Sequence, residues 1–292
     1  MRIGYIVNPV AGKKRVEDWL RVIRFYTETE GFQYGIYITD GPGDGIAKAE
    51  RAVKDGCDVV VAVGGDGTVS EVVNGIPENR DTVLGVLPVG TGNDFARTLK
   101  LPLELDEAVR ILLGMNIIPC DLGVVNGRYF INVASVGLDS QVVIEANKIK
   151  KSIPGSVAYI LGVFKAVNGY KPYDLEIQTE QGTVSRQATL IAVANGSYYG
   201  GGMKIAPRAR INDGLLDICL VRNMPRNRII ALFPLLFSGG HLKRPEVEYF
   251  NAEKIKVFCE KGFINSDGDI IGECPADMHI EPNALRVVVP EE

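Results

Sequence analysis

The stretch 58–99 places two apolar runs directly before two glycine turns, and this arrangement constrains the fold more than any other feature. The first run, Asp58–Val63, meets the turn Gly64–Thr68, and the second, Val83–Leu87, meets the turn 88–94. Each run is short, rich in β-branched residues and apolar at nearly every position, which is typical of a parallel strand covered on both faces. The sequence therefore predicts two parallel strands that each run into a glycine turn.

The first glycine turn has the properties of a phosphate-binding site. Thr68 and Glu71 have the T-x-x-E spacing of a capping box, so a helix is expected to start at Thr68. Free N–H groups at a helix start favour an anion such as phosphate, and glycines let the backbone come close to a ligand. Neither turn continues as a Walker A loop or as the dinucleotide fingerprint. A different kind of nucleotide site is therefore indicated.

Taken together, the motifs resemble those of the GGDGT kinases, which join diacylglycerol-type lipid kinases, sphingoid-base kinases, NAD kinases and, more remotely, phosphofructokinases. The stretch Leu87–Arg97 resembles the G-T-x-N-D-[FL]-A-R signature of the lipid kinase branch. The turn 8–14, which reads N-P-V-A-G-K-K, is similar to the N-P-x-[SA]-G-[KR] turn of the same family, although an ordinary βα turn would use the same residues. The resemblance to bacterial diacylglycerol kinases covers nearly the whole chain.

This resemblance implies that ATP is bound by residues that follow the strand ends. Asn8 and the backbone of its turn would contact the nucleotide, and Thr39 would lie near the adenosine. The implied nucleotide-binding residues are Asn8, Pro9, Val10, Ala11, Gly12, Thr39, Gly64, Gly65, Asp66, Gly67, Thr68, Glu71, Gly90, Thr91, Gly92, Asn93 and Asp94.

Residues 1–123 alternate between strand and helix patterns and predict an α/β domain with a parallel sheet. Arg2–Val7 is typical of a buried strand, and Val16–Thr29 has apolar residues at helical spacing. Residues 124–292 are mainly strand-like, with helical segments at 138–164 and 224–237, and predict a β-rich domain of two packed sheets. The resemblance places the D-L-G at 121–123 at the domain junction and ATP in the cleft between the domains.

Phosphoryl transfer requires positive charge on the transferring group, and a chain without a Walker lysine would obtain it from Mg²⁺ bound with the nucleotide. Asp66, Asp94 and Asp121 each follow a predicted strand end and could face one site. In the family, the equivalent carboxylates form a water-bridged network around magnesium. Asp94 is equally suited to cap the helix that follows it.

A second, structural Mg²⁺ is implied by the segment 199–215, which resembles the family's G-G-G-M…P-x-A-x-x-x-D-G-L pattern. The implied ligands are the carboxylate of Asp213 and the main-chain carbonyls of Arg210 and Leu215. From the residues alone, the Asp-Gly pair at 213–214 is equally a hairpin turn.

Phe263–Asp269 occupies the place of the family's D-G-E motif, in which an acidic residue accepts the proton of the lipid hydroxyl. The resemblance makes Asp267, Asp269 and Asp66 the catalytic candidates. Asp269 replaces the family's glutamate, so if it is the base, its reach falls by roughly 1.5 Å. The alternative is an Asp-Gly turn that only links two strands.

Composition and charge limit the partners. The net charge is −4 and the pI about 5.5, so a global basic field for nucleic acid is absent. Five cysteines without a C-x-x-C pair favour a reducing cytoplasm over a disulfide framework. Apolar segments 153–164 and 229–237 lie beside cations, as expected for peripheral association with an anionic membrane, but also for core helices with solvated ends. The flanking cations are Lys148, Lys150, Lys151, Arg226, Arg228, Lys243 and Arg244.

The sequence therefore predicts a cytoplasmic ATP-dependent lipid kinase that associates peripherally with the inner face of the cell membrane. It would transfer the γ-phosphate of ATP to diacylglycerol, giving phosphatidic acid. The alternatives are another acceptor, namely a sphingoid base, a different glycerolipid or NAD, and a catalytically silent nucleotide- or lipid-binding protein. The oligomeric state stays open, and a homodimer paired through an exposed sheet edge is one alternative.

Overall fold

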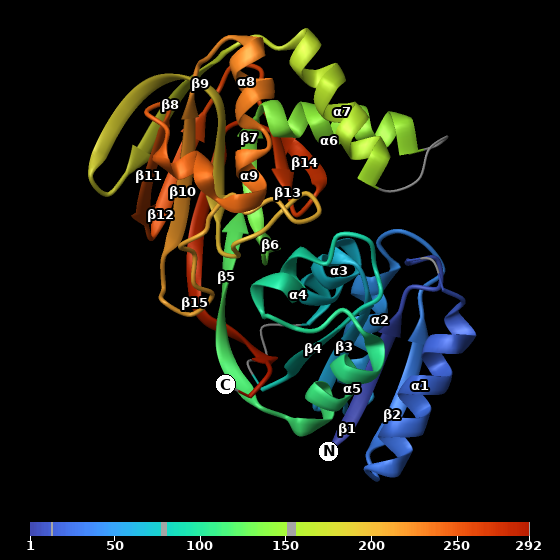
Figure 1. Cartoon of the computed structure of the whole chain (residues 1–292). Helices are drawn as coiled ribbons and strands as arrows, with labels where there is room; N and C mark the ends of the chain where they lie inside the picture. Colours follow the sequence, from blue (N-terminus) through green and yellow to red (C-terminus); the bar gives the residue numbers. More distant parts are fainter. Residues whose placement is uncertain (13, 77–80, 151–155, 292) are drawn as a thin grey trace. The chain divides into compact units, whose positions relative to one another are not determined.

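The computed structural model describes residues 1–12, 14–76, 81–150 and 156–291 (Figure 1). The chain forms two compact units, Met1–Leu122 together with the segment from Pro282 onwards, and Gly123–Glu281. The predicted bounds of the second domain, 124–292, differ from this division, because the last residues return to the first unit. They are carried there by the long strand β15 (Ala276–Val288).

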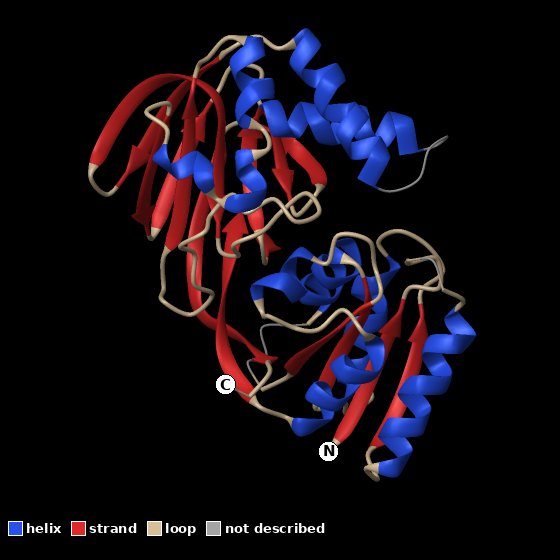
Figure 2. Cartoon of the chain, viewed as in Figure 1, coloured by secondary structure: helices blue, strands red, loops and turns tan. Residues whose placement is uncertain are grey.

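The first unit is a parallel sheet with connecting helices (Figure 2). Its strands lie in the order β2 (Gln33–Ile38), β1 (Arg2–Val7), β3 (Val59–Gly64), β4 (Val83–Pro88) and the end of β15, and each neighbouring pair is parallel. The helices are α1 (Val16–Thr29), α2 (Asp44–Lys54), α3 (Asp66–Gly75), α4 (Asp94–Thr98) and α5 (Leu105–Gly114). Both β3 and β4 are buried along their whole length, because apolar side chains occupy both faces. The prediction of an α/β fold with a parallel sheet is confirmed.

The carboxyl ends of the strands lie at one edge of this sheet, and backbone hydrogen bonds tie the turns there to one another. The N–H of Asn8 donates to the carbonyl of Val63 at 3.1 Å, and the N–H of Thr39 donates to the carbonyl of Val7 at 2.9 Å. The N–H of Gly90 donates to the carbonyl of Gly64 at 3.2 Å. The turns therefore hold fixed positions at the edge where ligands of parallel sheets bind.

The second unit is mostly β, as predicted. Its main path runs β14-β13-β7-β9-β8-β12-β15, and β10 and β11 branch from β9. The first half of β9 pairs with β8, and its second half pairs with β7 and β10. The bounds are β5 (Ile117–Val125), β6 (Arg128–Phe130), β7 (Val133–Gly137), β8 (Tyr173–Thr179), β9 (Gly182–Ala194), β10 (Leu216–Arg222), β11 (Val247–Ala252), β12 (Lys254–Phe258), β13 (Phe263–Ser266) and β14 (Asp269–Glu273).

Each of the two helical segments predicted for the second unit is divided. The first consists of α6 (Leu138–Lys150) and α7 (Ser156–Gly169). The second consists of α8 (Arg226–Leu232) and α9 (Leu235–Ser238), followed by a 3₁₀ turn, because Pro234 cannot supply the N–H that a continuous helix needs there. Helices α6 and α7 share a small apolar core that includes Leu138 and Val163, and Ile229 of α8 packs against it.

Part of the predicted membrane-facing segment lies outside the described residues, namely Lys151 and residues 153–155, as does residue 13 of the turn 8–14. Within the ranges that the structure describes, no helix has the length and apolar character needed to span a bilayer.

Candidate active site

A cavity of about 960 Å³, including its open mouth, lies at the carboxyl ends of the strands in the first unit. Most of the predicted nucleotide-binding residues line it, namely Asn8, Pro9, Val10, Ala11, Gly12, Thr39, Gly65, Gly67, Thr68, Glu71, Gly90 and Thr91. The sequence analysis missed three lining residues, Asp40, Gly41 and Pro42. The sequence could have indicated these residues, because they continue the loop that follows Thr39 at the end of β2.

Much of the wall of this cavity is backbone. A Cβ atom built on Gly90 would lie 2.3 Å from the Cα of Gly65, so the two glycine turns touch without side chains between them. Gly12 has a φ of +64°, and a Cβ there would lie 2.0 Å from the carbonyl oxygen of Val89. Gly67 differs, because a Cβ at this position would meet nothing within 4 Å. Gly67 therefore borders open space at the start of α3.

The predicted capping box is wrong. Helix α3 begins at Asp66 rather than at Thr68, and the preceding Gly65 has no side chain with which to cap it. Glu71 faces α2 instead, where its Oε1 accepts the N–H of Gly43 at 2.7 Å and its Oε2 accepts the N–H of Gly45 at 2.8 Å. The glutamate thus caps α2, and the positive end of α3 is left to face the cavity.

Asp66 joins the two glycine motifs. Its Oδ1 accepts the N–H groups of Asp94 at 2.6 Å and Phe95 at 3.1 Å, so Asp66 caps the N-terminus of α4. Burial raises the pKa of the Asp66 carboxyl, and the backbone hydrogen bonds from Phe95 and Asp94 act in the opposite direction. Asp94 is buried as the first residue of α4. The carboxylate that caps this helix therefore comes from α3.

The side chains of two asparagines form hydrogen bonds that connect neighbouring turns beside the cavity. The Nδ2 of Asn8 donates to the Oγ1 of Thr68 at 3.1 Å, which connects the first turn to α3. Asn93 has a φ of 56°, and its Nδ2 donates to the carbonyl of Gly90 at 3.0 Å. Five residues that the sequence also predicted are not among the lining residues of the cavity, namely Gly64, Asp66, Gly92, Asn93 and Asp94.

Asp121 does not follow a strand end, contrary to the prediction, because it lies inside β5. Its carboxylate is buried, and its Oδ1 accepts the N–H of Asn283 at 2.7 Å. This contact joins β5 to β15 in the first unit. Among the described residues, no three or more His, Cys, Asp and Glu side chains gather into a metal-binding group.

In the second unit, the two acidic residues of the predicted catalytic motif have different surroundings. Asp267 lies in the turn between β13 and β14, and its carboxylate accepts three backbone N–H groups, from Ile131 at 2.8 Å, Asn132 at 3.0 Å and Val133 at 3.0 Å. Asp269 is exposed, and its Oδ2 lies 2.8 Å from a guanidinium nitrogen of Arg128. Asp267 is therefore bound to the segment that leads into β7, and Asp269 is open to solvent.

The loop predicted to hold a structural metal contains an Asx-type turn. Asp213 is exposed, and its Oδ1 accepts the N–H of Leu215 at 3.1 Å. Metal binding by Asp213 and by the carbonyls of Arg210 and Leu215 stays a prediction.

The chain thus combines a parallel α/β unit, with a glycine-walled cavity at the strand ends where ligands of such sheets bind, and a mostly-β unit. Residues 2–125 match the family model described as the diacylglycerol kinase catalytic domain. Residues 132–289 match the model described as the YegS C-terminal NAD kinase beta sandwich-like domain.

Similar proteins cover the whole chain. A protein named diacylglycerol kinase from Staphylococcus haemolyticus is 34% identical over 98% of this chain and 88% of its own length. A second, from Staphylococcus saprophyticus, is 33% identical over 98% of this chain and 97% of its own length. A crystal structure of a diacylglycerol kinase from Bacillus anthracis superposes with a TM-score of 0.82 at 26% identity, covering 99% and 96% of the two chains. The chain belongs to the diacylglycerol kinase family and is a lipid kinase, which implies the use of ATP.

Proposed function

We propose that this protein transfers the γ-phosphate of ATP to the hydroxyl of diacylglycerol and produces phosphatidic acid. The backbone-walled cavity of the first unit supports this proposal most strongly, because it offers N–H groups and open space where phosphates would bind. The names of the similar proteins support diacylglycerol as the acceptor.

The phosphates of ATP are proposed to bind at Gly65 and Gly67, against the first turn of α3. Positive charge at this helix end favours the phosphates, and the absence of a Cβ at Gly67 leaves room for them. The hydrogen bond between Asn8 and Thr68 fixes the neighbouring wall. Thr39, which lines the same cavity, is proposed to lie near the adenosine.

Mg²⁺ is proposed to bind with the nucleotide near Asp66 and Asp94. The donor set fits a cation that keeps most of its waters and not one enclosed by the protein, because the described residues contain no larger acidic group and Asp66 already binds two N–H groups. When bound, Mg²⁺ would neutralise charge on the phosphates. Asp121 fits this role poorly, because it is buried within β5.

Asp269 is proposed to be the general base, and Asp267 to be a positioning residue. The three N–H groups on Asp267 occupy both of its oxygens, whereas Asp269 is exposed with one neighbouring cation. In the proposed step, the lipid hydroxyl oxygen bonds to the γ-phosphorus and the bond from that phosphorus to the bridging oxygen breaks. The hydroxyl proton passes to Asp269, and ADP leaves.

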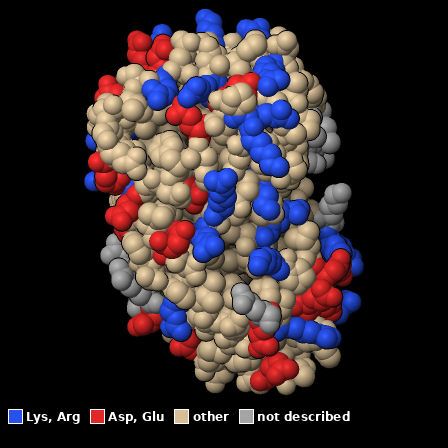
Figure 3. Space-filling view, turned by 60° about the vertical axis from the view of Figure 1, so that its left-hand side comes forward, with Lys and Arg blue, Asp and Glu red and all other residues tan. Residues whose placement is uncertain are grey.

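The acceptor is proposed to be taken from the cytoplasmic face of a membrane. In the upper half of Figure 3, which draws part of the second unit, Lys and Arg side chains lie close together. Apolar side chains are exposed on α7, α8 and α9, namely Leu161, Phe164, Ile230 and Phe237. Cationic and apolar surface together favour binding to anionic lipid.

The test is transfer of labelled γ-phosphate from ATP and Mg²⁺ to a panel of lipids in mixed micelles, with NAD in a parallel reaction. Label in phosphatidic acid is expected. Label only on a sphingoid base or only on NAD would show that diacylglycerol is the wrong acceptor. The absence of any labelled product would contradict the proposal that the protein is an active kinase.

A further inference from the structure

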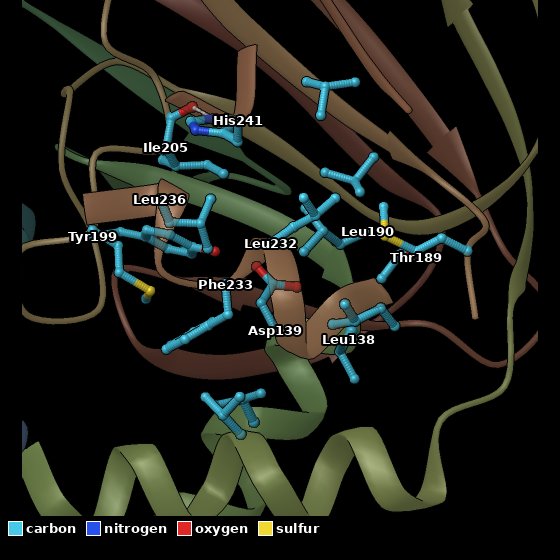
Figure 4. Close-up of a pocket in the computed structure, with 17 residues that line it drawn as sticks. Leu138, Asp139, Thr189, Leu190, Tyr199, Ile205, Leu232, Phe233, Leu236 and His241 are labelled. Carbon is cyan, nitrogen blue, oxygen red and sulfur yellow. Dashed lines mark hydrogen bonds between the residues drawn. The ribbon is translucent and has the colours of Figure 1, made fainter. Parts of the chain in front are cut away.

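The second unit contains an apolar cavity of about 700 Å³, including its opening, that is separate from the nucleotide cavity (Figure 4). Its walls come from α6, α7, α8, α9, β9 and β10, and include Leu138, Val163, Leu190, Leu232 and Phe233. A lining that is mostly apolar with a few polar groups is typical of pockets that bind small molecules.

One of those polar groups is a buried carboxylate. Asp139, the second residue of α6, is only 4% exposed. Its Oδ1 accepts the N–H of Ser140 at 2.9 Å, but its Oδ2 is buried without a hydrogen-bond partner among the described residues. Figure 4 shows Asp139 among Leu138, Leu232 and Phe233, within the lining of the cavity.

His241 and Thr189, two other polar residues of the lining, have other partners, and outside the lining the Ser135 side chain forms a hydrogen bond with the Asp139 carboxyl that lowers its pKa. The Nε2 of His241 bonds to the carbonyl of Ile205 at 3.0 Å (Figure 4). Thr189 donates to the carbonyl of Arg222 at 3.0 Å. A buried carboxylate oxygen with no donor is costly, and such groups in folded proteins normally have a partner. A ligand that brings a hydroxyl group into the cavity would supply one.

Helices α7 and α8 offer a route for such a ligand. Val163 and Ile229 line the cavity, whereas Phe164 and Ile230, their neighbours in the chain, are 54% and 46% exposed. The same helices are therefore apolar both inside and outside, which suits an amphiphile that passes from a membrane into the protein.

We infer that this cavity binds a single hydrocarbon chain of the acceptor lipid, and that Asp139 accepts a hydrogen bond from a hydroxyl of that lipid. The inference rests on the proposed function, because it assigns the chain-binding site of the proposed acceptor. An ionised Asp139 would also repel an amphiphile whose polar end is a carboxylate. The site would thus select uncharged hydroxyl-bearing lipids.

The test is calorimetric binding without nucleotide at pH 8, with two probes of equal chain length, 1-decanoylglycerol and decanoate. We expect 1-decanoylglycerol to bind at least about tenfold more tightly than decanoate, since a charged hydrogen bond replaces a repulsion. Leu232→Trp fills the cavity and should weaken binding of 1-decanoylglycerol at least about tenfold. Ala231→Trp, at an exposed position of the same helix that does not line the cavity, is the matched control and should leave binding unchanged.

Asp139→Asn tests whether the charge of Asp139, and not only the shape of the cavity, determines which lipid binds. It keeps the shape of the side chain but removes its charge, so the tenfold preference for 1-decanoylglycerol should fall below about threefold. Glu145→Gln makes the same change on α6 outside this cavity and should keep the preference. Equal binding of the two probes by the unaltered protein, or an unchanged preference in Asp139→Asn, would overturn the inference.

Kinase assays separate this inference from the proposed function. Binding that follows the expected pattern in a protein without phosphoryl transfer would sustain the chain site and contradict the kinase proposal. Full transfer by Leu232→Trp with an unchanged KM for diacylglycerol would overturn the chain site and leave the kinase proposal intact.

Discussion

The two cavities of this chain are built from different parts of the polypeptide. In the first unit, the wall is largely backbone, and Gly12 and Gly90 approach other backbone atoms too closely for any Cβ. In the second unit, the wall is made of apolar side chains from separate helices and strands, with Asp139 among them. A backbone wall requires glycine at fixed positions, whereas an apolar wall requires only side chains of suitable volume. The first kind of site leaves a sequence motif, and the second does not.

The largest effect is expected from Gly90→Ala. The added methyl group would lie 2.3 Å from the Cα of Gly65, so the two glycine turns must separate. We expect kcat/KM to fall by at least about 100-fold, because small displacements in a positioning site have large effects on rate. Gly114→Ala is the control, since a Cβ there meets nothing within 4 Å. Activity within threefold of the unaltered protein would show that the turns need not touch.

The second prediction distinguishes the two carboxylates of the β13–β14 turn. Asp267→Asn leaves only one oxygen for three N–H donors, and we expect a loss of about 3 to 5 kcal/mol in the free energy of unfolding. Asp269→Asn breaks only an exposed ion pair and should change stability by less than about 1 kcal/mol, while kcat falls at least about 100-fold. Urea denaturation and steady-state kinetics measure both quantities. The reverse pattern would exchange the two roles.

The third prediction concerns the pH dependence of stability. Burial raises the pKa of Asp139 from 3.8 to about 6. A carboxyl with a raised pKa in the folded state contributes stability that is present below the unfolded pKa and is lost as pH rises through the folded pKa. Asp139→Asn should therefore gain stability relative to the unaltered protein between about pH 4 and pH 6, reaching about 3 kcal/mol above that range. Urea denaturation at pH 4.5 and pH 8 measures the difference, and a gain that is larger at pH 4.5 would contradict this account.

The smallest effect is expected from Glu71→Gln. The amide keeps one acceptor but loses the charge that binds the N–H groups of Gly43 and Gly45, so stability should fall by about 1 kcal/mol. Glu50→Gln, on the exposed side of α2, is the control and should cost less than about 0.5 kcal/mol. Equal losses in the two variants would show that Glu71 does not cap α2.

Features that depend on local sequence could be predicted. The strand Arg2–Val7 and the helix Val16–Thr29 have the bounds that their apolar patterns indicate. The lining of the cavity in the first unit was largely predicted, because each motif follows a strand in one parallel sheet, where topology brings the strand ends together.

Features that depend on distant partners could not be predicted. The T-x-x-E pattern suggested a local capping box, but the partners of Glu71 lie 28 and 26 residues away in the chain. Asp139 follows a strand and begins a helix, as many capping residues do, and only packing with Leu232 and Phe233 surrounds its free oxygen with apolar atoms. The different surroundings of Asp267 and Asp269 likewise depend on contacts with residues 128–133.

The most direct test of the central claim is a single kinetic comparison of Gly67→Val and Leu232→Trp, with the KM for ATP and the KM for diacylglycerol measured for each. The valine at position 67 enters the space beside α3, and the tryptophan at position 232 enters the apolar cavity. We predict that Gly67→Val raises only the KM for ATP and that Leu232→Trp raises only the KM for the lipid, each by about tenfold or more. If both variants changed the same constant, or if each changed the other's, the assignment of one cavity to the nucleotide and one to the lipid chain would be wrong.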